Sequence, residues 1–402
     1  MSAVSPSKYN RIELQKKGKK SVELKGGVVS VDYYESLYSP TVTANVMYVD
    51  AGGNLEDDKN KLTSVKEALP ITGLEDLFFN ITNETGELKF LKKDAFKVSK
   101  APVMTRESNR QAVLLSVVSP QLKQNNDDPI FDKYMGKISD TVKKILKEKL
   151  KISNDKLDIE PTQNGYNFLG KGRGGLDLVL DLCKRSVPVK GDAGFFFYQT
   201  KSGFKFKSIN ELISQKPEFT LVYFGGFKQD NTEDNNDNKI MMPPRFEKDQ
   251  DVIKSLKGGV YRSRNIFFDP RTFCYEEVTY DISAKEGIKK TLGGAPPFAD
   301  DVKSFTKTFH HILDVGSLDS NPSTKINNDP RDWQASSVMR YNLLHSQVVH
   351  IQIPCNLKLE AGNVIKMEIE STSANKEEGA KDEQQSGNYL ILNLCHHFTD
   401  RR

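Results

Sequence analysis

The sequence predicts a mainly β fold that contains an inserted α+β domain, and three observations lead to this fold class. In the first third of the chain, apolar and polar residues alternate over residues 28–32 and 39–50, which is typical of half-buried antiparallel strands. From Tyr134 onward the apolar residues recur with a helical period. After residue 219 the alternation returns and continues almost to the C-terminus. Helices are therefore expected between two β regions.

The first β region is predicted over residues 21–118. Val29 and Val31 share one face of the first expected strand, and the next strand places four residues on one face, namely Val42, Ala44, Val46 and Tyr48. Further strands are expected at residues 77–82, 90–98 and 110–118. Together these strands predict a small β-barrel or sandwich. Residues 1–20, which are rich in lysine, are predicted to form a mobile N-terminal arm.

The inserted α+β domain is predicted over residues 119–215. Its first helix has an apolar stripe made by Ile138, Val142, Ile145, Leu146 and Leu150. The lysines of residues 143–151 lie outside this stripe and are interpreted as a solvated face, with a partner contact as the open alternative. A second helix is predicted from Leu176, Val179, Leu180 and Cys183. A hairpin over residues 194–208 and a capping box before a short helix complete the domain.

The second β region is predicted to be discontinuous in sequence. Residues 216–240 and 300–402 are assigned to a second β domain, and residues 241–299 to a peripheral β insertion. Strands are expected at residues 219–227, 350–353, 364–369 and 388–398, with a hairpin at 260–282 and a helix at 333–346.

Composition argues against several classes of protein. The 402 residues carry 58 basic and 54 acidic side chains, a net charge of +4, which does not indicate a protein that coats nucleic acid. The N-terminus is polar and no apolar run approaches the ~18 residues of a membrane span. We therefore expect folding in a cytoplasm and no membrane partner. Four scattered cysteines are expected to be reduced thiols: Cys183, Cys274, Cys355 and Cys395.

Two motifs could carry chemistry, and neither fits it. The histidine pairs His310–His311 and His396–His397 are adjacent in sequence, so on a strand each pair points to opposite faces and cannot share a metal ion. The glycine-rich residues 170–175 lack the GKS or GKT that a phosphate-binding loop needs, and are interpreted as a flexible helix entry. No catalytic, cofactor-binding or metal site is predicted, and the protein is expected not to be an enzyme. A glycosidase pair of carboxylates stays open, because spacing along the chain does not exclude it.

Several segments resemble one protein family. The likeness lies in eight stretches that follow the family order, which are residues 28–46, 134–146, 157–162, 166–170, 193–200, 203–209, 351–365 and 387–398. The chain resembles the baseplate central hub proteins of T-even-type contractile-tailed phages, in particular the cyanophage-like members. These proteins are related in architecture to the hub domains of type VI secretion spikes.

This resemblance implies a fold, a function and a set of partners. It implies two small antiparallel β-barrel domains that form a ring, placed at residues 21–118 and in the second β domain. It also implies a trimeric structural protein of the virion, located in the phage tail baseplate and assembled in the host cytoplasm. Such a homotrimer joins the sixfold tail tube to the threefold central spike and leaves a conduit in which DNA is present only in transit. The implied partners are the central spike protein, the tail tube proteins and their initiator, baseplate wedge proteins and the tape measure. The alternatives are a tail-associated cell-wall hydrolase, another tail-tube initiator component, or a secretion-system spike.

Overall fold

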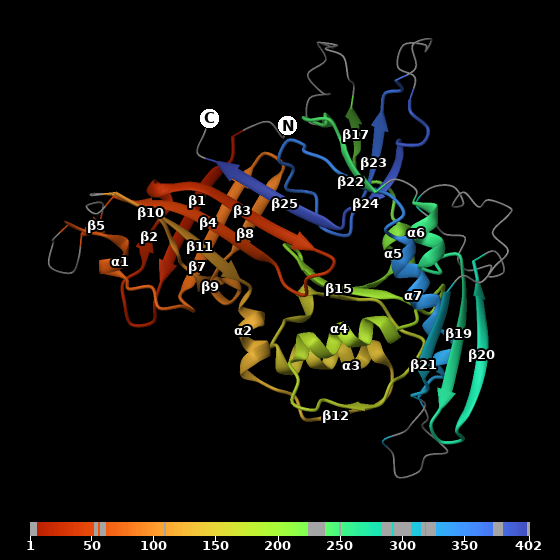
Figure 1. The fold of residues 1–402 in the computed structure, drawn as a ribbon. Coiled ribbons are helices and arrows are strands. Elements are labelled where there is room, and N and C mark those ends of the chain that lie inside the picture. Colours follow the sequence, from red (N-terminus) through yellow and green to blue (C-terminus); the bar gives the residue numbers. More distant parts are fainter. Residues whose placement is uncertain are drawn as a thin grey trace.

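The structure is a computed structural model in which the chain forms several separate sheets with helices between them (Figure 1). It describes residues 6–51, 55–56, 62–107, 110–223, 238–248, 251–282, 292, 307–314, 318, 327–372 and 381–399. Parts of the predicted second β region, at residues 224–237 and 293–306, lie outside the described residues. The expected mainly β fold is confirmed at this level.

A ten-stranded sheet dominates the N-terminal half of the chain. Its strands follow the order β2-β1-β7-β9-β11-β4-β3-β25, with β10 paired to β11 and β8 paired to β7. The strands are β1 Lys8–Gln15, β2 Val22–Glu23, β3 Val28–Ser36, β4 Thr43–Asp50, β7 Asp76–Asn83, β8 Gly86–Phe90, β9 Phe96–Lys100, β10 Val103–Arg106, β11 Gln111–Val118 and β25 Asn393–Thr399. Small elements accompany it: η1 Lys25–Gly27, β5 Leu55–Glu56, β6 Leu62–Thr63, α1 Val65–Ala68 and η2 Lys92–Asp94.

The core of this sheet follows the predicted alternation along β4. Val42, Ala44, Val46 and Tyr48 are all buried, and they pack with residues of β1, β7, β9 and β11 in one apolar cluster. The alternation predicted for β3 is wrong at Val29, which is exposed while Val31 is buried. The cause is a register shift between β3 and β4 at this position, because a bulge moves the following side chains to the other face.

Two predictions about this region need correction. Residues 8–15, placed in the mobile arm, form β1, and its Ile12 and Leu14 are fully buried against β7. The lysines that follow β1 dominate the local composition and obscured its short apolar alternation. The strand order is also open in the described part of the chain, running from β2 to β25, so no closed barrel is found there. Alternation identifies strands but does not show which edges pair.

The inserted α+β region packs around a separate apolar cluster. The five predicted stripe residues are all buried in it, which confirms the first helix. That helix is α3 Ile138–Lys144, continued by the π-helical turn η3 Ile145–Lys149. The other elements are α2 Pro120–Asp127, β12 Lys133–Tyr134, η4 Asn154–Lys156, β13 Leu157–Ile159, β14 Phe168–Leu169, α4 Gly175–Arg185, β15 Phe195–Thr200, β16 Gly203–Ser208 and α5 Ile209–Ile213.

The C-terminal region forms three small sheets within the described ranges. The first contains β17 Thr220–Tyr223, β23 Val364–Ile369 and β24 Gly387–Leu390, and the second contains β18 Arg245–Lys248 and β22 Val348–His350. The third contains β19 Arg262–Asp269, β20 Cys274–Asp281 and β21 Lys307–Ile312. The helical elements are α6 Val252–Lys257, η7 Pro330–Asp332 and α7 Gln334–Leu343.

The predicted second barrel is therefore distributed differently. The expected strand at residues 388–398 is two strands in two sheets, because β24 pairs with β23 whereas β25 pairs with β3 of the large sheet. Strand β21, expected in the second barrel, pairs with β19 of the peripheral hairpin. In Figure 1 the blue β25 lies across the red and orange strands, far in sequence from its neighbours.

Candidate assembly surface

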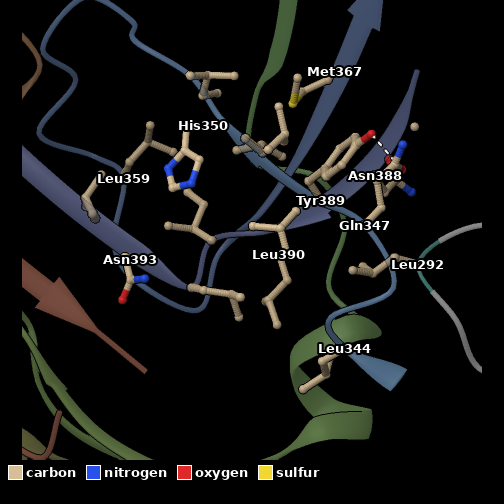
Figure 2. Close-up of a pocket in the computed structure, with 18 of the residues that line it drawn as sticks. Leu292, Leu344, Gln347, His350, Leu359, Met367, Asn388, Tyr389, Leu390 and Asn393 are labelled. Atoms are coloured by element: carbon tan, nitrogen blue, oxygen red, sulfur yellow. Dashed lines mark hydrogen bonds between the residues drawn. The ribbon is translucent and has the colours of Figure 1, made fainter. Parts of the chain in front are cut away.

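A large groove lies among the C-terminal strands and has a volume of about 1610 Å³. Its wall combines residues from β22, β24 and β25 with the segment that follows β22. Figure 2 shows Leu344, Leu359, Met367, Tyr389 and Leu390 among the side chains that line this groove. Many of the wall residues are apolar side chains that are only half-buried, among them Val349, Ile351, Ile353, Leu390, Ile391, Leu392 and Leu394. We call this feature the apolar groove.

Three strands that line the groove have an unpaired edge. In the described part of the chain, β22 pairs only with β18, β24 only with β23, and β25 only with β3. An unpaired edge leaves backbone N–H and C=O groups available to another strand. The groove thus combines half-buried apolar side chains with three strands that each have one paired neighbour in the described part of the chain.

A buried carboxylate joins three distant segments next to this groove. Glu35 on β3 is 2% exposed. It accepts hydrogen bonds from the backbone N–H of Lys201 at 2.7 Å, from that of Ala361 at 2.8 Å, and from the hydroxyl of Tyr33 at 2.8 Å. Lys201 belongs to the turn between β15 and β16, and Ala361 precedes β23. This single side chain therefore connects the large sheet, the α+β region and the C-terminal region.

A second carboxylate, Glu360, adds to this connection. We call Glu35, Glu360 and their hydrogen-bond partners the polar joint. It accepts hydrogen bonds from the hydroxyls of Thr200 at 2.9 Å and Ser202 at 2.8 Å, and forms an ion pair with Lys205 at 2.7 Å. Lys201 lies within 3.8 Å of its other oxygen. Because these partners of the Glu360 carboxylate all lie on the β15–β16 hairpin, the carboxylate fixes the segment before β23 against the α+β region.

The two carboxylates have opposite pKa shifts. Burial raises the pKa of Glu35 to about 7, and the nearby charge of Glu360 adds to this effect. Burial also acts to raise the pKa of Glu360, but Lys205 and its other partners outweigh it and hold that pKa below its ordinary value. Burial lowers the pKa of the Lys201 ammonium. The joint therefore holds one carboxylate that is charged and one that titrates near neutral pH.

The two members of each histidine pair lie on opposite faces of their strand, as predicted. His396 is buried next to the thiol of Cys355, with 3.8 Å between Nδ1 and Sγ, while His397 is exposed and contacts Asp32. Likewise His311 is half-buried and His310 is exposed. Burial lowers the pKa of His396 to about 4. Within the ranges that the structure describes, no group of three or more His, Cys, Asp or Glu residues is placed to hold a metal ion.

The glycine-rich residues 170–175 are packed rather than open. A Cβ on Gly170 would lie 2.2 Å from the carbonyl oxygen of Ile130, and one on Gly174 would lie 2.4 Å from Oδ1 of Asn125. The same Asn125 oxygen accepts the backbone N–H of Leu176 at 2.7 Å. One of the amides that a phosphate would need at this helix start is therefore already occupied.

The other residues singled out from the sequence lie apart from the groove or at its wall. Lys143, Lys144 and Lys151 are exposed and Lys147 and Lys149 are half-buried, as expected for a largely solvated face. Lys149 pairs with Asp132 at 2.6 Å.

All four cysteines are free: Cys183 is buried, Cys355 is half-buried, and Cys274 and Cys395 are exposed.

Sequence reasoning missed both the groove and the polar joint. One signal was present: Val31, Tyr33 and Glu35 alternate on the buried face of β3, so a carboxylate stands where an apolar residue is expected. A charge at such a position needs hydrogen-bond partners. Those partners lie 166 and 326 residues away in the chain, and the groove is likewise formed by segments that only the tertiary fold brings together.

Comparison with solved structures shows a fold shared with phage tail proteins. The tail protein from Neisseria meningitidis MC58 aligns with a TM-score of 0.54 and 8% identity, over 98% of this chain and 93% of that one. The 43 kDa tail protein of prophage MuSo2 from Shewanella oneidensis aligns with a TM-score of 0.51 and 10% identity, over 97% and 94%. A type VI secretion component from E. coli, described as similar to the T4 tail proteins gp27 and gp5, aligns at 0.42 and 9%, over 99% and 74%.

These likenesses extend over nearly the whole chain. No protein-family model matches the sequence, and no curated protein matches it either. Among the described helices, none is both long and apolar enough to cross a bilayer.

Proposed function

We propose that this chain is a non-enzymatic structural protein of a contractile phage tail, the central hub of the baseplate. The observation that carries the proposal is the fold, which two phage tail proteins share over almost their full length and almost all of this chain. The eight segments that resemble baseplate hub proteins give the finer assignment. In this role the chain forms a trimer that links the tail tube to the central spike and leaves a passage for DNA.

The geometry supports an assembly role. The apolar groove leaves apolar side chains half-buried and three strand edges unpaired in the described single chain. Contact between apolar surface and water is unfavourable in free energy, and a large exposed apolar surface is typical of a binding site. Contact with a neighbouring subunit or a tail component buries it. The polar joint supports the same role, because it holds three regions of the chain in a fixed arrangement.

The test is the oligomeric state of the purified protein. Size-exclusion chromatography with light scattering should give the mass of three chains, either alone or after addition of the cognate spike protein. A species that stays monomeric in the presence of the spike contradicts the proposal. Incubation with purified host cell wall tests the hydrolase alternative, and release of soluble fragments favours it.

A further inference from the structure

Strands β12 and β14 belong to a two-stranded ladder at the edge of the α+β region. The ladder begins at the bridge between Ile130 and Arg173, continues through the β12–β14 pair, and ends at the bridge between Lys137 and Gly165. Figure 1 shows β12 at the lower edge of this region. We call the two segments that the ladder joins, residues 130–137 and 165–173, the ribbon.

One side of the ribbon belongs to the core. Tyr134 and Phe168 are partners across the ladder, and their rings stack with 5.4 Å between centroids. Tyr134 is buried, and Phe168 packs against the apolar cluster of the α+β region. This packing fixes the ribbon on the body of the protein.

The ribbon also exposes large apolar side chains. Phe131 is 71% exposed, Leu169 43% and Met135 36%. Leu169 is the direct partner of Lys133, which is also exposed, so these two side chains share a face. A Cβ on Gly172 would lie 3.0 Å from the ring of Phe131, so this ring rests on the backbone of the second segment. Apolar and basic side chains therefore reach solvent together.

Positive charge is concentrated on the ribbon and on the helix beside it. Lys144 of α3 has its Nζ 5.9 Å from the centroid of the Tyr134 ring, and Lys149 of η3 pairs with Asp132. Residues 130–151 and 165–173 together carry nine basic and three acidic side chains, whereas the whole chain has a net charge of only +4. Such charge asymmetry is typical of a chain that meets an anionic partner.

Few of these basic groups are neutralised within the chain. Arg173 pairs with Asp181 as Lys149 does with Asp132. Among the described residues, Lys137, Lys144, Lys147 and Lys171 take part in no ion pair. The other two acids of these segments, Asp140 and Glu148, leave an excess of positive charge. This surface is therefore complementary to an anionic partner.

The exposed apolar side chains decide which anionic partner fits. A nucleic-acid strand is bound through aromatic rings on which successive bases stack, but the other exposed side chains beside Phe131 are Met135 and Leu169. The boundary of a bilayer takes both kinds of group, because apolar side chains enter the acyl layer while lysines meet the headgroup phosphates.

We propose that the ribbon binds the surface of an anionic phospholipid bilayer. Phe131, Met135 and Leu169 enter the interface, and the lysines around them contact the headgroups. The sequence was expected to have no membrane partner because it has no spanning segment, and a surface contact needs none. The inference does not depend on the hub role.

The first test is co-sedimentation of the full chain with vesicles. Binding should be weak to phosphatidylcholine alone, should increase when phosphatidylglycerol is added, and should decrease as salt is added. Lys137→Glu should weaken binding to the mixed vesicles by at least about fivefold, and Phe131→Ser by about tenfold. Their matched controls, Lys358→Glu and Phe273→Ser, change exposed residues outside the ribbon and should bind like the wild type.

The second test reports insertion directly. The native chain has one tryptophan, Trp333, which is buried, so the Phe131→Trp variant adds an exposed fluorophore at the ribbon. Its emission should shift to the blue on vesicles that contain phosphatidylglycerol and should not shift on phosphatidylcholine alone. The Phe273→Trp variant should show no shift on either.

Several outcomes overturn the inference. These are equal binding to both kinds of vesicle, wild-type binding by both ribbon variants, and no blue shift of the Phe131→Trp variant. Tighter binding to duplex DNA than to the mixed vesicles, unchanged in Phe131→Ser, assigns the basic surface to nucleic acid and also overturns it. All these results are separate from the oligomeric state, so the hub proposal can stand or fail independently.

Discussion

The large N-terminal sheet and the small C-terminal sheets differ in how completely they bury their apolar side chains. The large sheet encloses its own cluster, in which the side chains of Phe79, Phe96, Val113 and Leu115 are fully buried. In the C-terminal region, Tyr389, Leu390 and Ile391 face the apolar groove and are only half-buried. The sheet of β19–β21 adds an apolar row that nothing in the described chain covers.

This difference separates stability from assembly. Burial of apolar area is the main favourable contribution to folding, so the large sheet supplies much of the stability of the single chain. The C-terminal region leaves part of its apolar area in contact with water, so that area contributes less to the stability of the single chain. In the assembly that we propose, a partner would bury it and gain that free energy. The polar joint of Glu35 and Glu360 lies between the two regions, and its hydrogen bonds hold them in a fixed relative position.

The sharpest test of this comparison is one substitution made in both regions. Leu115→Ala removes a fully buried side chain from β11, and we expect a loss of about 2–5 kcal/mol in the free energy of unfolding. Leu390→Ala, in the half-buried groove wall, should cost roughly half as much or less in the isolated chain. Urea unfolding followed by circular dichroism measures both. Equal losses would remove the distinction between the regions.

The polar joint should make stability depend on pH. The pKa of Glu35 is about 7 when folded and near its ordinary value of 4.5 when unfolded. The folded chain therefore keeps this proton as the pH rises, and the stabilisation is complete below pH 4.5 and lost by pH 7. The expected loss is up to about 3 kcal/mol. Glu35→Gln should lack this loss, as urea unfolding at pH 5 and pH 8 would show.

A second titrating group, His396, is the reason to compare the wild type with the Glu35→Gln variant instead of measuring the wild type alone. Its pKa is lowered to about 4, so the unfolded chain binds that proton first and stability falls as the pH drops below about 6.5. This contribution opposes that of Glu35 and is present in both chains, so it cancels in their difference. Parallel profiles for wild type and Glu35→Gln between pH 5 and pH 8 would show that Glu35 does not titrate there.

The smallest expected effect concerns the glycine-rich residues 170–175. Asn125→Ala removes the side chain that accepts the Leu176 N–H at the start of α4, and we expect a loss of about 1 kcal/mol in the free energy of unfolding, as for other helix caps. Urea unfolding measures this loss.

The same glycine-rich residues are expected not to bind nucleotide, so calorimetric titration of the wild type with ATP should show no binding. Micromolar binding would mean that the packed loop opens to take a phosphate.

The fold was predictable where a local pattern decides it. The alternation of Val42 to Tyr48 and the stripe from Ile138 to Leu150 both ended in buried faces, because burial on one face is what creates those patterns. The strand at β1 was missed because its short alternation, with Ile12 and Leu14 buried, stands beside a run of lysines. Pairing was not predictable, since no local pattern shows that β25 lies beside β3 rather than beside β24.

The candidate surfaces were less predictable than the fold. The groove and the exposed apolar row of the β19–β21 sheet consist of ordinary apolar residues, and their sequence does not distinguish them from core residues such as Phe267. Only the register of β19 with β20 and β21 shows that Phe268 and Tyr275 share the uncovered face. The polar joint gave one signal, the carboxylate of Glu35 in a buried alternation, but its partners were visible only in three dimensions.

The position of β25 has a consequence for the order of events during synthesis. Ser36 of β3 pairs with Asn393 of β25 across 357 residues, so one edge of the large sheet stays open until translation has passed residue 393. Contacts this distant form slowly, because a long loop must close first. A nascent chain therefore has no finished edge and no finished groove wall. In the ring that we propose, a contact that needs this edge or this groove wall would form only after residues 393–399 have been made.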